Sequence, residues 1–288
     1  FFGLNLHFFK TIPMPVITLT SDFGNTDHRI AAMKGRIISL NPDITILDIS
    51  HDIQAYNLKQ TAYIVKNAYH HFPKGSIHII AVDSFYHKDR KCIIYKADGH
   101  YFIAADNGVL SLIFFDIKPE TVYEITYNTR FDDIVRFAAA DVLVPAAVHL
   151  HNGGLPEVIG RKYTTPKQLS FPNAGFTDHM IFGEVLYIDN FGNIISNISK
   201  AYFEEHYVIF DRFTIKFRNL ALSKIYSGYT GLVTEWENET EFHGKPAAIF
   251  NEAGLLELTI YKGNIKNGAH TLFGLNIGER IYVEFHKD

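Results

Sequence analysis

Residues 16–27 read VITLTSDFGNTD and contain the junction that decides the fold. The apolar and β-branched run Val16–Thr20 predicts a buried strand. Ser21–Asp27 is then a polar loop, and apolar residues at helical spacing predict a helix that ends at Asn41-Pro42. A short buried strand followed by a helix is the first half of a βαβ unit.

The same alternation of strands and helices continues along the first half of the chain. Ile44–Ile49 and Ser76–Val82 predict two further strands, and a helix is expected between them over Asn57–Phe72. A hairpin around Asp98-Gly99 and a helix over Asp141–Leu150 follow. We therefore predict an N-terminal α/β domain whose mostly parallel sheet is flanked by helices.

The residue pattern of the sequence changes from about residue 161. Pro166, Pro172 and Gly175 lie in an irregular stretch, and helical periodicity is scarce beyond it. Short strand candidates separated by turn residues predict a C-terminal antiparallel β-barrel-like domain: Gly183–Asp189, Tyr207–Phe210, Thr214–Phe217, Ala247–Phe250, Leu255–Tyr261 and Arg280–Phe285. The expected organisation is an extension over 1–13, an N-terminal domain over 14–162, a linker over 163–179 and a C-terminal domain over 180–288.

Composition restricts the class of protein. The formal charge of −4 and the absence of a Lys/Arg run argue against nucleic acid or an anionic membrane surface as a partner. Cys92 is the only cysteine, which excludes an intrachain disulfide and favours a reducing, cytoplasmic location. No apolar run approaches the roughly 18 residues needed to span a bilayer, and Phe1–Lys10 lacks the features of a signal peptide.

Acidic residues follow two of the predicted strands, at the sheet edge where α/β proteins bind ligands. Asp22 and Asp27 are placed to hold a ribose diol or an ammonium group, although Asp27 is equally suited to cap the following helix. Asp83 ends the third strand, and Arg90 follows seven residues later. This pair suits a carboxylate that orients or deprotonates a water; the alternative is a surface ion pair.

Polar turns in the second half offer further candidates. Asp189-Asn190-Phe191-Gly192-Asn193 ends in an amide that can both donate to and accept from a purine edge, or it is simply a hairpin turn. Asn251-Glu252-Ala253-Gly254 has a similar but weaker character. His70-His71 and His149-x-His151 lack a third ligand at a suitable spacing, so no metal is expected.

Several short motifs follow one another in order from about Met14 to near the end of the chain. They are Thr18–Gly24, Met33-Lys34-Gly35, Leu47–His51, Phe72–Gly75, Asp106-Asn107-Gly108, Pro145-Ala146-Ala147, Asp189–Asn193 and Lys262-Gly263-Asn264. Each motif is weak alone, but the ordered set is specific. It resembles the S-adenosyl-L-methionine (SAM) hydroxide adenosyltransferases, which are adenosine-forming SAM hydrolases related to the fluorinases and chlorinases.

The resemblance implies a homotrimer with its site between neighbouring subunits, SAM as the substrate and no cofactor. The implied substrate contacts are Asp22 for the ribose hydroxyls, Asp27 near the methionine portion, Tyr56 against the nucleoside, Asp189 for the methionine ammonium and Asn193 for adenine, with Phe191 and Asn251 beside them. An aromatic ring at position 56 would supply packing worth roughly 1 kcal/mol.

The family holds its attacking water with an Asp, an Arg and a His. Asp83 and Arg90 match the first two, whereas Ala138 stands at the histidine position and Ala140 replaces a further arginine. His87 is a candidate substitute for the imidazole, or else a solvated loop residue. A halogenase is disfavoured because the Asp83 carboxylate would repel a halide.

Three functions remain to be distinguished. The leading hypothesis is hydrolysis of SAM to adenosine and L-methionine by attack of water at the ribose C5′. The second is a catalytically weakened SAM- or adenosine-binding protein, because Ala138 replaces the family histidine and Glu252 replaces a usual serine. The third is an unrelated two-domain nucleotide-binding protein.

Overall fold

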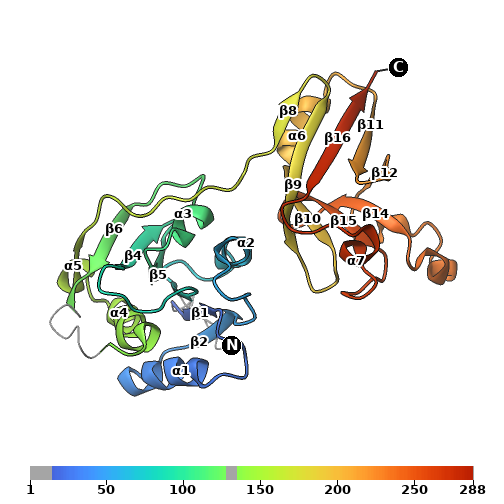
Figure 1. Ribbon diagram of the computed structural model, residues 1–288. Coiled ribbons are helices and arrows are strands. Elements are labelled where there is room, and N and C mark those ends of the chain that lie inside the picture. Colours follow the sequence, from blue (N-terminus) through green and yellow to red (C-terminus); the bar gives the residue numbers. More distant parts are fainter. Residues whose placement is uncertain (1–14, 128–134, 288) are drawn as a thin grey trace, which may run out of the picture. The chain divides into compact units, whose positions relative to one another are not determined.

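The computed structural model describes residues 15–127 and 135–287, so the expected extension over 1–13 lies outside the described residues. The chain divides into two compact units, one ending at Ser170 and the other beginning at Phe171 (Figure 1). Each unit has a hydrophobic core of its own. The two units are therefore separate folding elements with separate sets of buried side chains.

The first unit is built on a seven-stranded sheet. The strand order is β2 (Ile46–Ser50), β1 (Ile17–Ser21), β3 (Ile77–Ala81), β5 (His100–Ala105), β4 (Cys92–Ala97), β6 (Thr121–Ile125) and β7 (Gly160–Lys162). The strands from β2 to β5 in this order pair in parallel, and the remaining pairs are antiparallel. Only β4 and β7 therefore run against the other strands, and the predicted mostly parallel sheet is confirmed.

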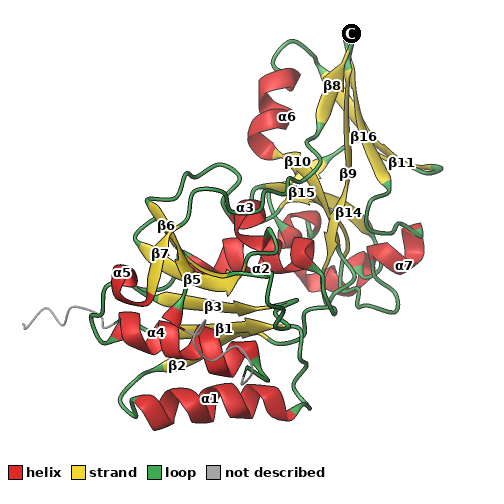
Figure 2. Ribbon diagram, turned by 60° about the vertical axis from the view of Figure 1, so that its left-hand side comes forward, coloured by secondary structure: helices red, strands yellow, loops and turns green. Residues whose placement is uncertain are grey.

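Helices cover both faces of this sheet (Figure 2). One face carries α1 (His28–Leu40) and α4 (Val144–His151), whose apolar side chains join those of β1 and β3 in one core. The other carries α2 (Leu58–Tyr69) and α3 (Val109–Ile113). The short α5 (Pro156–Ile159) leads into β7. Side-chain caps from Asp27 and Asn57 begin α1 and α2, which explains why both helices start where the sequence predicts.

Pro145 makes the start of the fourth helix irregular. It has no backbone N–H to donate into the previous turn, and a π-helical segment, η3 (Ala139–Leu143), precedes α4. The hydroxyl of Tyr127 donates to the carbonyl oxygen of Val142 at 2.7 Å. The Asp141 carboxylate accepts from the backbone N–H of Phe137 at 2.9 Å. These bonds fix the segment that contains Ala138.

The sheet face beneath α2 buries two histidines. Nδ1 of His78 lies 2.7 Å from the hydroxyl of Thr18, and its Nε2 lies 3.3 Å from Nδ1 of His100. Burial, reinforced by His100, lowers the pKa of His78 to about 3. Both rings are thus held neutral in the core near pH 7. Cys92 in β4 is also buried, and burial raises the pKa of its thiol to about 12.

The second unit is a curled, largely antiparallel sheet. Its order is β12 (Leu220–Leu222), β11 (Arg212–Phe217), β16 (Arg280–His286), β9 (Met180–Ile188), β10 (Ile194–Ser199), β15 (Leu255–Ile260), β14 (Pro246–Phe250) and β13 (Ile225–Tyr226), with β8 (Gly175–Thr177) also on β9. Only β13 and β14 pair in parallel. Two 3₁₀ segments, η4 (Tyr229–Leu232) and η5 (Trp236–Phe242), precede β14. The predicted antiparallel β-barrel-like domain is confirmed.

The predicted strand over Tyr207–Phe210 is wrong. Ser199 caps α6 (Lys200–Tyr207) by accepting from the N–H of Tyr202 at 3.1 Å, so the helix runs as far as Tyr207. The next residues form a turn in which Val208 is exposed. The helix cap therefore overrides the β-propensity of this aromatic and β-branched run. A second short helix, α7 (Ala269–Phe273), follows β15.

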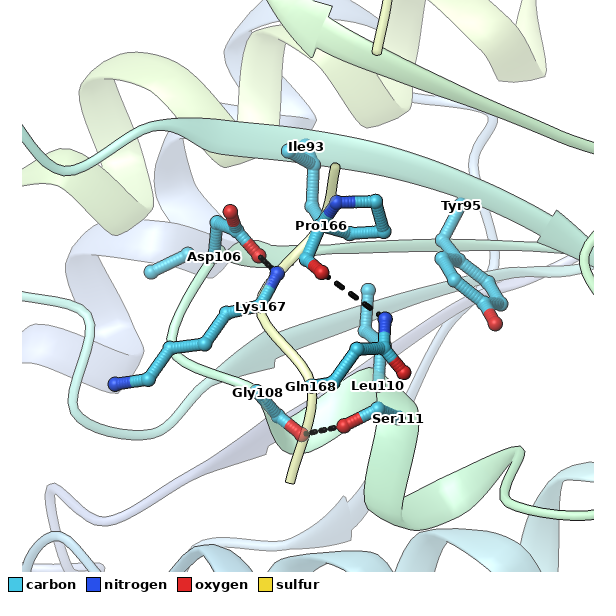
Figure 3. A pocket seen from close by; sticks show the side chains of 10 residues that line it. Ile93, Tyr95, Asp106, Gly108, Leu110, Ser111, Pro166, Lys167 and Gln168 are labelled. Atoms are coloured by element: carbon cyan, nitrogen blue, oxygen red, sulfur yellow. Dashed lines mark hydrogen bonds between the residues drawn. The ribbon is translucent and has the colours of Figure 1, made fainter. Parts of the chain in front are cut away.

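Residues 163–170 return across the first unit as a strap (Figure 3). The N–H of Lys167 donates to Asp106 at 2.8 Å, and the N–H of Leu169 donates to the hydroxyl of Ser111 at 2.8 Å. A Cβ on Gly108 would lie 2.5 Å from Leu169, so only glycine permits this approach. The cavity under the strap is about 10 Å³, which holds at most about one water. It is therefore no ligand site.

Candidate active site

Asp22 lies directly beyond the carboxyl end of β1 and is bonded to two distant loops. Its Oδ2 accepts from the N–H of Tyr56 at 2.9 Å and from that of Asp83 at 3.3 Å. Both donor residues have left-handed backbone angles, with φ of 64° and 45°, which are uncommon outside glycine. The structure thus brings three predicted site residues together from the loops after β1, β2 and β3.

Asp83 and Arg90 form the predicted pair. Nη1 of Arg90 donates to Oδ1 of Asp83 at 3.0 Å and to its backbone carbonyl oxygen at 2.8 Å. Within residues 15–127 and 135–287, the other carboxylate oxygen, Oδ2, has no hydrogen-bond partner. The two side chains line a shallow, open depression of about 400 Å³. One oxygen of Asp83 is therefore oriented by Arg90 while the other remains available.

Two aromatic rings lie beside these acids. The ring of Tyr56 is 60% exposed and its centroid lies 6.3 Å from that of Phe85, which is 53% exposed. Exposed aromatic side chains in a loop offer apolar surface to a planar ligand. Phe85 was not among the site residues predicted from the sequence. The two aromatic residues of Ser84-Phe85-Tyr86, directly after Asp83, could have indicated it.

Asp27 caps α1, which is the helix-cap alternative that the sequence offered to a ligand contact. Its Oδ1 accepts from the N–H of Arg29 at 2.9 Å, and its Oδ2 lies 2.6 Å from Nη1 of the same residue. The bond from the Arg29 backbone lowers the pKa of Asp27 despite some desolvation, and the positive charges of Arg29 and His28 add to this effect. The carboxylate is thus already paired within its own loop. A contact with methionine stays a prediction.

A second cavity, of about 270 Å³, borders the position of the missing family histidine. Its lining includes Ala138 and Phe137 together with Phe23, Phe85 and Arg29. The volume equals several waters at about 30 Å³ each, so an imidazole at position 138 has room to extend.

His87 lines the same depression as Asp83 and Arg90, but in the described ranges no hydrogen bond joins its ring to either of them. Its side chain is 64% exposed, and its Nδ1 accepts only from the N–H of Asp89 among the hydrogen bonds of the described chain. The interpretation of His87 as a solvated loop residue therefore fits the structure better.

The second unit presents a polar turn between β9 and β10, in which Asp189 is bonded mainly to its near neighbours in the sequence. Oδ1 of Asp189 accepts from the N–H groups of Phe191 and Asn193, both at 2.8 Å, and its Oδ2 accepts from the Asn193 side-chain amide at 2.9 Å. The hydroxyl of Thr259 donates to Oδ1 of Asn193 at 2.5 Å. These residues therefore form the hairpin turn that one of the two interpretations predicts. The turn leaves the Phe191 ring 61% exposed, while the adenine contact of Asn193 stays a prediction.

Glu257 on β15 joins this cluster and was missed from the sequence. It is only 7% exposed and accepts from the Asn251 amide at 3.1 Å. Burial raises the pKa of Glu257 to about 7, helped by the charges of Asp189 and Glu252 and opposed by the bond from Asn251. Because alternate residues of a strand share a face, Glu257 lies on the same face as Thr259. Asp189, Asn193 and Asn251 therefore gather around one face of β15.

In the two described ranges, no group of three or more His, Cys, Asp or Glu side chains is arranged to hold a metal ion. None of the helices there combines the length and the apolar character required to cross a lipid bilayer.

Comparison with known proteins identifies the family. Residues 17–160 match the model of the SAM hydroxide adenosyltransferase N-terminal domain, and residues 183–282 match that of the C-terminal domain. The (R)-S-adenosyl-L-methionine hydrolase of Methanocaldococcus jannaschii is 28% identical over 87% of this chain and 90% of its own. A fluorinase of Nocardia brasiliensis is 24% identical over 66% of this chain and 73% of its own.

A solved structure supports the same fold. The crystal structure of an uncharacterized conserved protein from Thermotoga maritima superimposes with a TM-score of 0.81, at 24% identity, over 93% of this chain and 99% of the other. The two matching domain models together span most of the sequence, in the order that the motifs predict. This chain belongs to the SAM hydroxide adenosyltransferase family.

Proposed function

We propose that this protein hydrolyses SAM to adenosine and L-methionine by attack of water on the ribose C5′. The observation that carries the proposal is the arrangement of Asp83, whose Oδ1 is bonded to Arg90 while its Oδ2 has no hydrogen-bond partner in the described ranges. The backbone N–H of the same aspartate donates to Asp22. A carboxylate oriented in this way is suited to hold a water beside a ribose bound at Asp22.

Hydrolysis of SAM requires mainly that the protein align the water with the ribose C5′. Water forms the new C5′–O bond while the C5′–S bond breaks, and the sulfonium leaves as the neutral thioether of methionine. No acid is needed at the leaving group, so the water and C5′ must mainly be aligned and shielded from solvent. Asp83 accepts the proton that the water loses. We expect this step to proceed with Ala138 in place of the family histidine, but more slowly.

We assign the substrate contacts from the two clusters. Asp22 binds the ribose hydroxyls, Tyr56 and Phe191 contact the nucleoside, and Asp189 holds the methionine ammonium. Asn193 and Asn251 border the adenine, and Asp27 lies near the methionine portion. No cofactor takes part. Because clustered carboxylates repel phosphate, SAM or adenosine should bind more tightly than ATP.

We further propose that the chain assembles as a homotrimer in the cytoplasm, with each site completed by a neighbouring subunit. The family resemblance supports the trimer, and the single buried Cys92 supports a reducing compartment. Mixing subunits tests the shared site. Asp22→Ala and Asp189→Ala proteins should each bind SAM poorly, and mixed trimers should recover binding because some sites escape both substitutions. A monomer at micromolar concentration in light scattering would contradict the assembly.

Incubation with SAM tests the reaction. The two sulfonium epimers are supplied separately, because the hydrolase relatives are named for the (R) form. Adenosine and methionine are followed by chromatography, with and without added fluoride or chloride. We expect adenosine in all cases and no 5′-halogenated nucleoside. Tight SAM binding by calorimetry without any product would instead favour the catalytically weakened binding protein.

Ala138→His examines the missing imidazole. The cavity of about 270 Å³ beside Ala138 provides room for the ring. A general acid–base group typically contributes about 10²–10⁴-fold, and we expect an increase at the low end because Asp83 already orients the water. Ala147→Ser, a small change at a buried helical position, is a control for nonspecific effects. An unchanged rate would show that the imidazole is not what limits turnover.

A further inference from the structure

A buried serine, Ser21, directly precedes the proposed ribose-binding Asp22, and its side chain contacts the buried His51. The hydroxyl of Ser21 lies 2.7 Å from Nδ1 of His51. Ser21 is fully buried and His51 is 3% exposed, so neither group is placed to contact a ligand directly. The proposed reaction uses neither of them.

The surrounding contacts favour one direction for this hydrogen bond. The N–H of Phe23 lies 3.5 Å from Oγ of Ser21 and donates to that oxygen. Donation of the Ser21 proton to Nδ1 of His51 leaves the proton of a neutral ring on Nε2. Nε2 lies 3.1 Å from Oδ1 of Asp48, outside hydrogen-bond geometry but close enough for electrostatic attraction.

Asp48 is itself held by a cation. Its Oδ2 accepts from Nζ of Lys34 at 2.6 Å. Desolvation raises the pKa of Asp48, but the hydrogen bond from Lys34 and the electrostatic attraction of Lys34 and His51 outweigh it, so the pKa is lowered overall. The carboxylate therefore stays ionised and favours the tautomer with the proton on Nε2. Lys34, Asp48, His51 and Ser21 form one continuous chain of polar contacts that leads to Asp22.

The backbone of His51 makes a second connection to the same loop. Its carbonyl oxygen accepts from the N–H of Gly24 at 2.9 Å. His51 thus binds the residue before Asp22 through its side chain and the second residue after it through its backbone. The Asp22 loop is fixed on both sides by a single residue, while the carboxylate accepts from Tyr56 and Asp83.

We propose that His51 is a positioning residue, which holds the Asp22 carboxylate in the orientation that recognises the ribose hydroxyls of the substrate. The inference rests on the proposed function of Asp22. His51 acts through Ser21 and never touches the ligand. Its loss should therefore impair recognition of the ribose diol more than recognition of the base.

Ribose discrimination tests this assignment with the full-length protein. Calorimetry compares adenosine with 2′,3′-dideoxyadenosine, and the ratio of their dissociation constants measures recognition of the diol. We expect Asp22→Ala to bring this ratio close to one, and His51→Leu to lower it about 10-fold. His51→Asn, whose side-chain oxygen can accept from Ser21, should keep most of the ratio.

The control is Ile79→Val, a buried β3 substitution that should lower stability without changing the ratio. Equal weakening of both nucleosides by His51→Leu, with Asp22→Ala still abolishing discrimination, would overturn the positioning role alone. An unchanged ratio in Asp22→Ala would overturn the Asp22 assignment, and the inference with it.

Hydrogen exchange supplies a readout that needs no ligand. The amides of Tyr56 and Asp83 donate to Asp22, so peptides containing them should exchange about 10-fold faster in His51→Leu than in the parent. His51→Asn should exchange like the parent. Unchanged protection of both amides in His51→Leu would show that His51 does not hold Asp22 in place.

Discussion

The two units hold their key aspartates in different ways. Asp22 in the first unit accepts from residues 34 and 61 positions away along the chain. Asp189 in the second accepts from residues two and four positions away. The orientation of Asp22 therefore depends on the correct packing of three strands, whereas that of Asp189 depends on one turn. Substitutions far from the ligand should disturb the first cluster more than the second.

The buried ionisable groups of the two units also differ. The first unit buries His78 and His100, whose pKa values are lowered. The second buries Glu257, whose pKa is raised to about 7. Burial favours the neutral form of both kinds of group. Because one is a base and the other an acid, the two units should lose stability at opposite ends of the pH scale.

The largest expected effect separates reaction from binding. Asp83→Asn should lower turnover of SAM by about 10²–10⁴-fold, because it removes the carboxylate that we propose acts on the water. SAM affinity should stay within a few-fold. Asp189→Asn should instead weaken SAM binding more than it slows the bound complex. Single-turnover kinetics with calorimetry measures both quantities.

Asp43→Asn is the matched control, since this exposed aspartate of the first unit lines neither the open depression nor the cavity beside the site. Hydrolysis by Asp83→Asn at the parent rate would remove Asp83 from the mechanism. Equal and negligible rates in parent and variant would favour the binding protein.

The next effect concerns Glu257. Its pKa is about 7 when folded, against an ordinary value of 4.5, so the folded state keeps a proton that the unfolded state releases between these values. The second unit should therefore lose about 3 kcal/mol of stability as the pH rises from about 4.5 to above 7. Glu257→Gln should flatten this slope, whereas the exposed Glu205→Gln should keep it. Urea titrations read by hydrogen-exchange mass spectrometry report peptides of β15 separately.

The first unit should respond to pH in the opposite direction. His78 has a folded pKa of about 3 and an ordinary value of 6.5, so only the unfolded state binds the proton between them. Its contribution should fall by about 2 kcal/mol from pH 7.5 to pH 5. His78→Asn should reduce the slope for peptides of β3, and the exposed His87→Asn should leave it unchanged. Stability that changes with pH in the same direction in both units would contradict this difference between their buried groups.

The smallest effect tests the range over which each aspartate acts. Asp22→Ala removes the acceptor for two backbone amides and should cost about 1–2 kcal/mol of local stability. Faster hydrogen exchange should then spread to the loops of Tyr56 and Asp83. Asp189→Ala should speed exchange only within its own turn. Faster exchange in other strands of the second unit would show that Asp189 stabilises more than its own turn.

Much of the fold follows from local signals in the sequence. Asp27 and Asn57 cap their helices where the hydrophobic pattern begins, and Asp98-Gly99 turns a hairpin with both residues at positive φ. The strand predicted over Tyr207–Phe210 failed because the helix capped by Ser199 extends to Tyr207 and overrides side-chain propensity. The strand β10, Ile194–Ser199, was missed because Ser196 and Asn197 interrupt its apolar pattern.

The site was predictable only in part. Strand ends in a parallel sheet bring Asp22 and Asp83 to one edge, so their proximity could be anticipated. The bonds from Tyr56 and Asp83 to one oxygen depend on backbone angles that sequence patterns do not specify. Glu257 was missed because a charged residue in a strand usually faces solvent, whereas Glu257 is buried and pairs across the sheet with the apolar Ile195 and Ile249. The role of His51 depends on a contact 30 residues away.

The burial of Cys92 has a practical consequence for labelling. A thiol whose pKa is raised to about 12 and whose side chain is buried reacts slowly with maleimides at neutral pH. Cysteines introduced at exposed lysines, such as Lys59→Cys in the first unit and Lys200→Cys in the second, would carry the dyes or spin labels almost alone. Distances between the units, and their change on adding SAM, thus become measurable by spectroscopy without replacing the native cysteine.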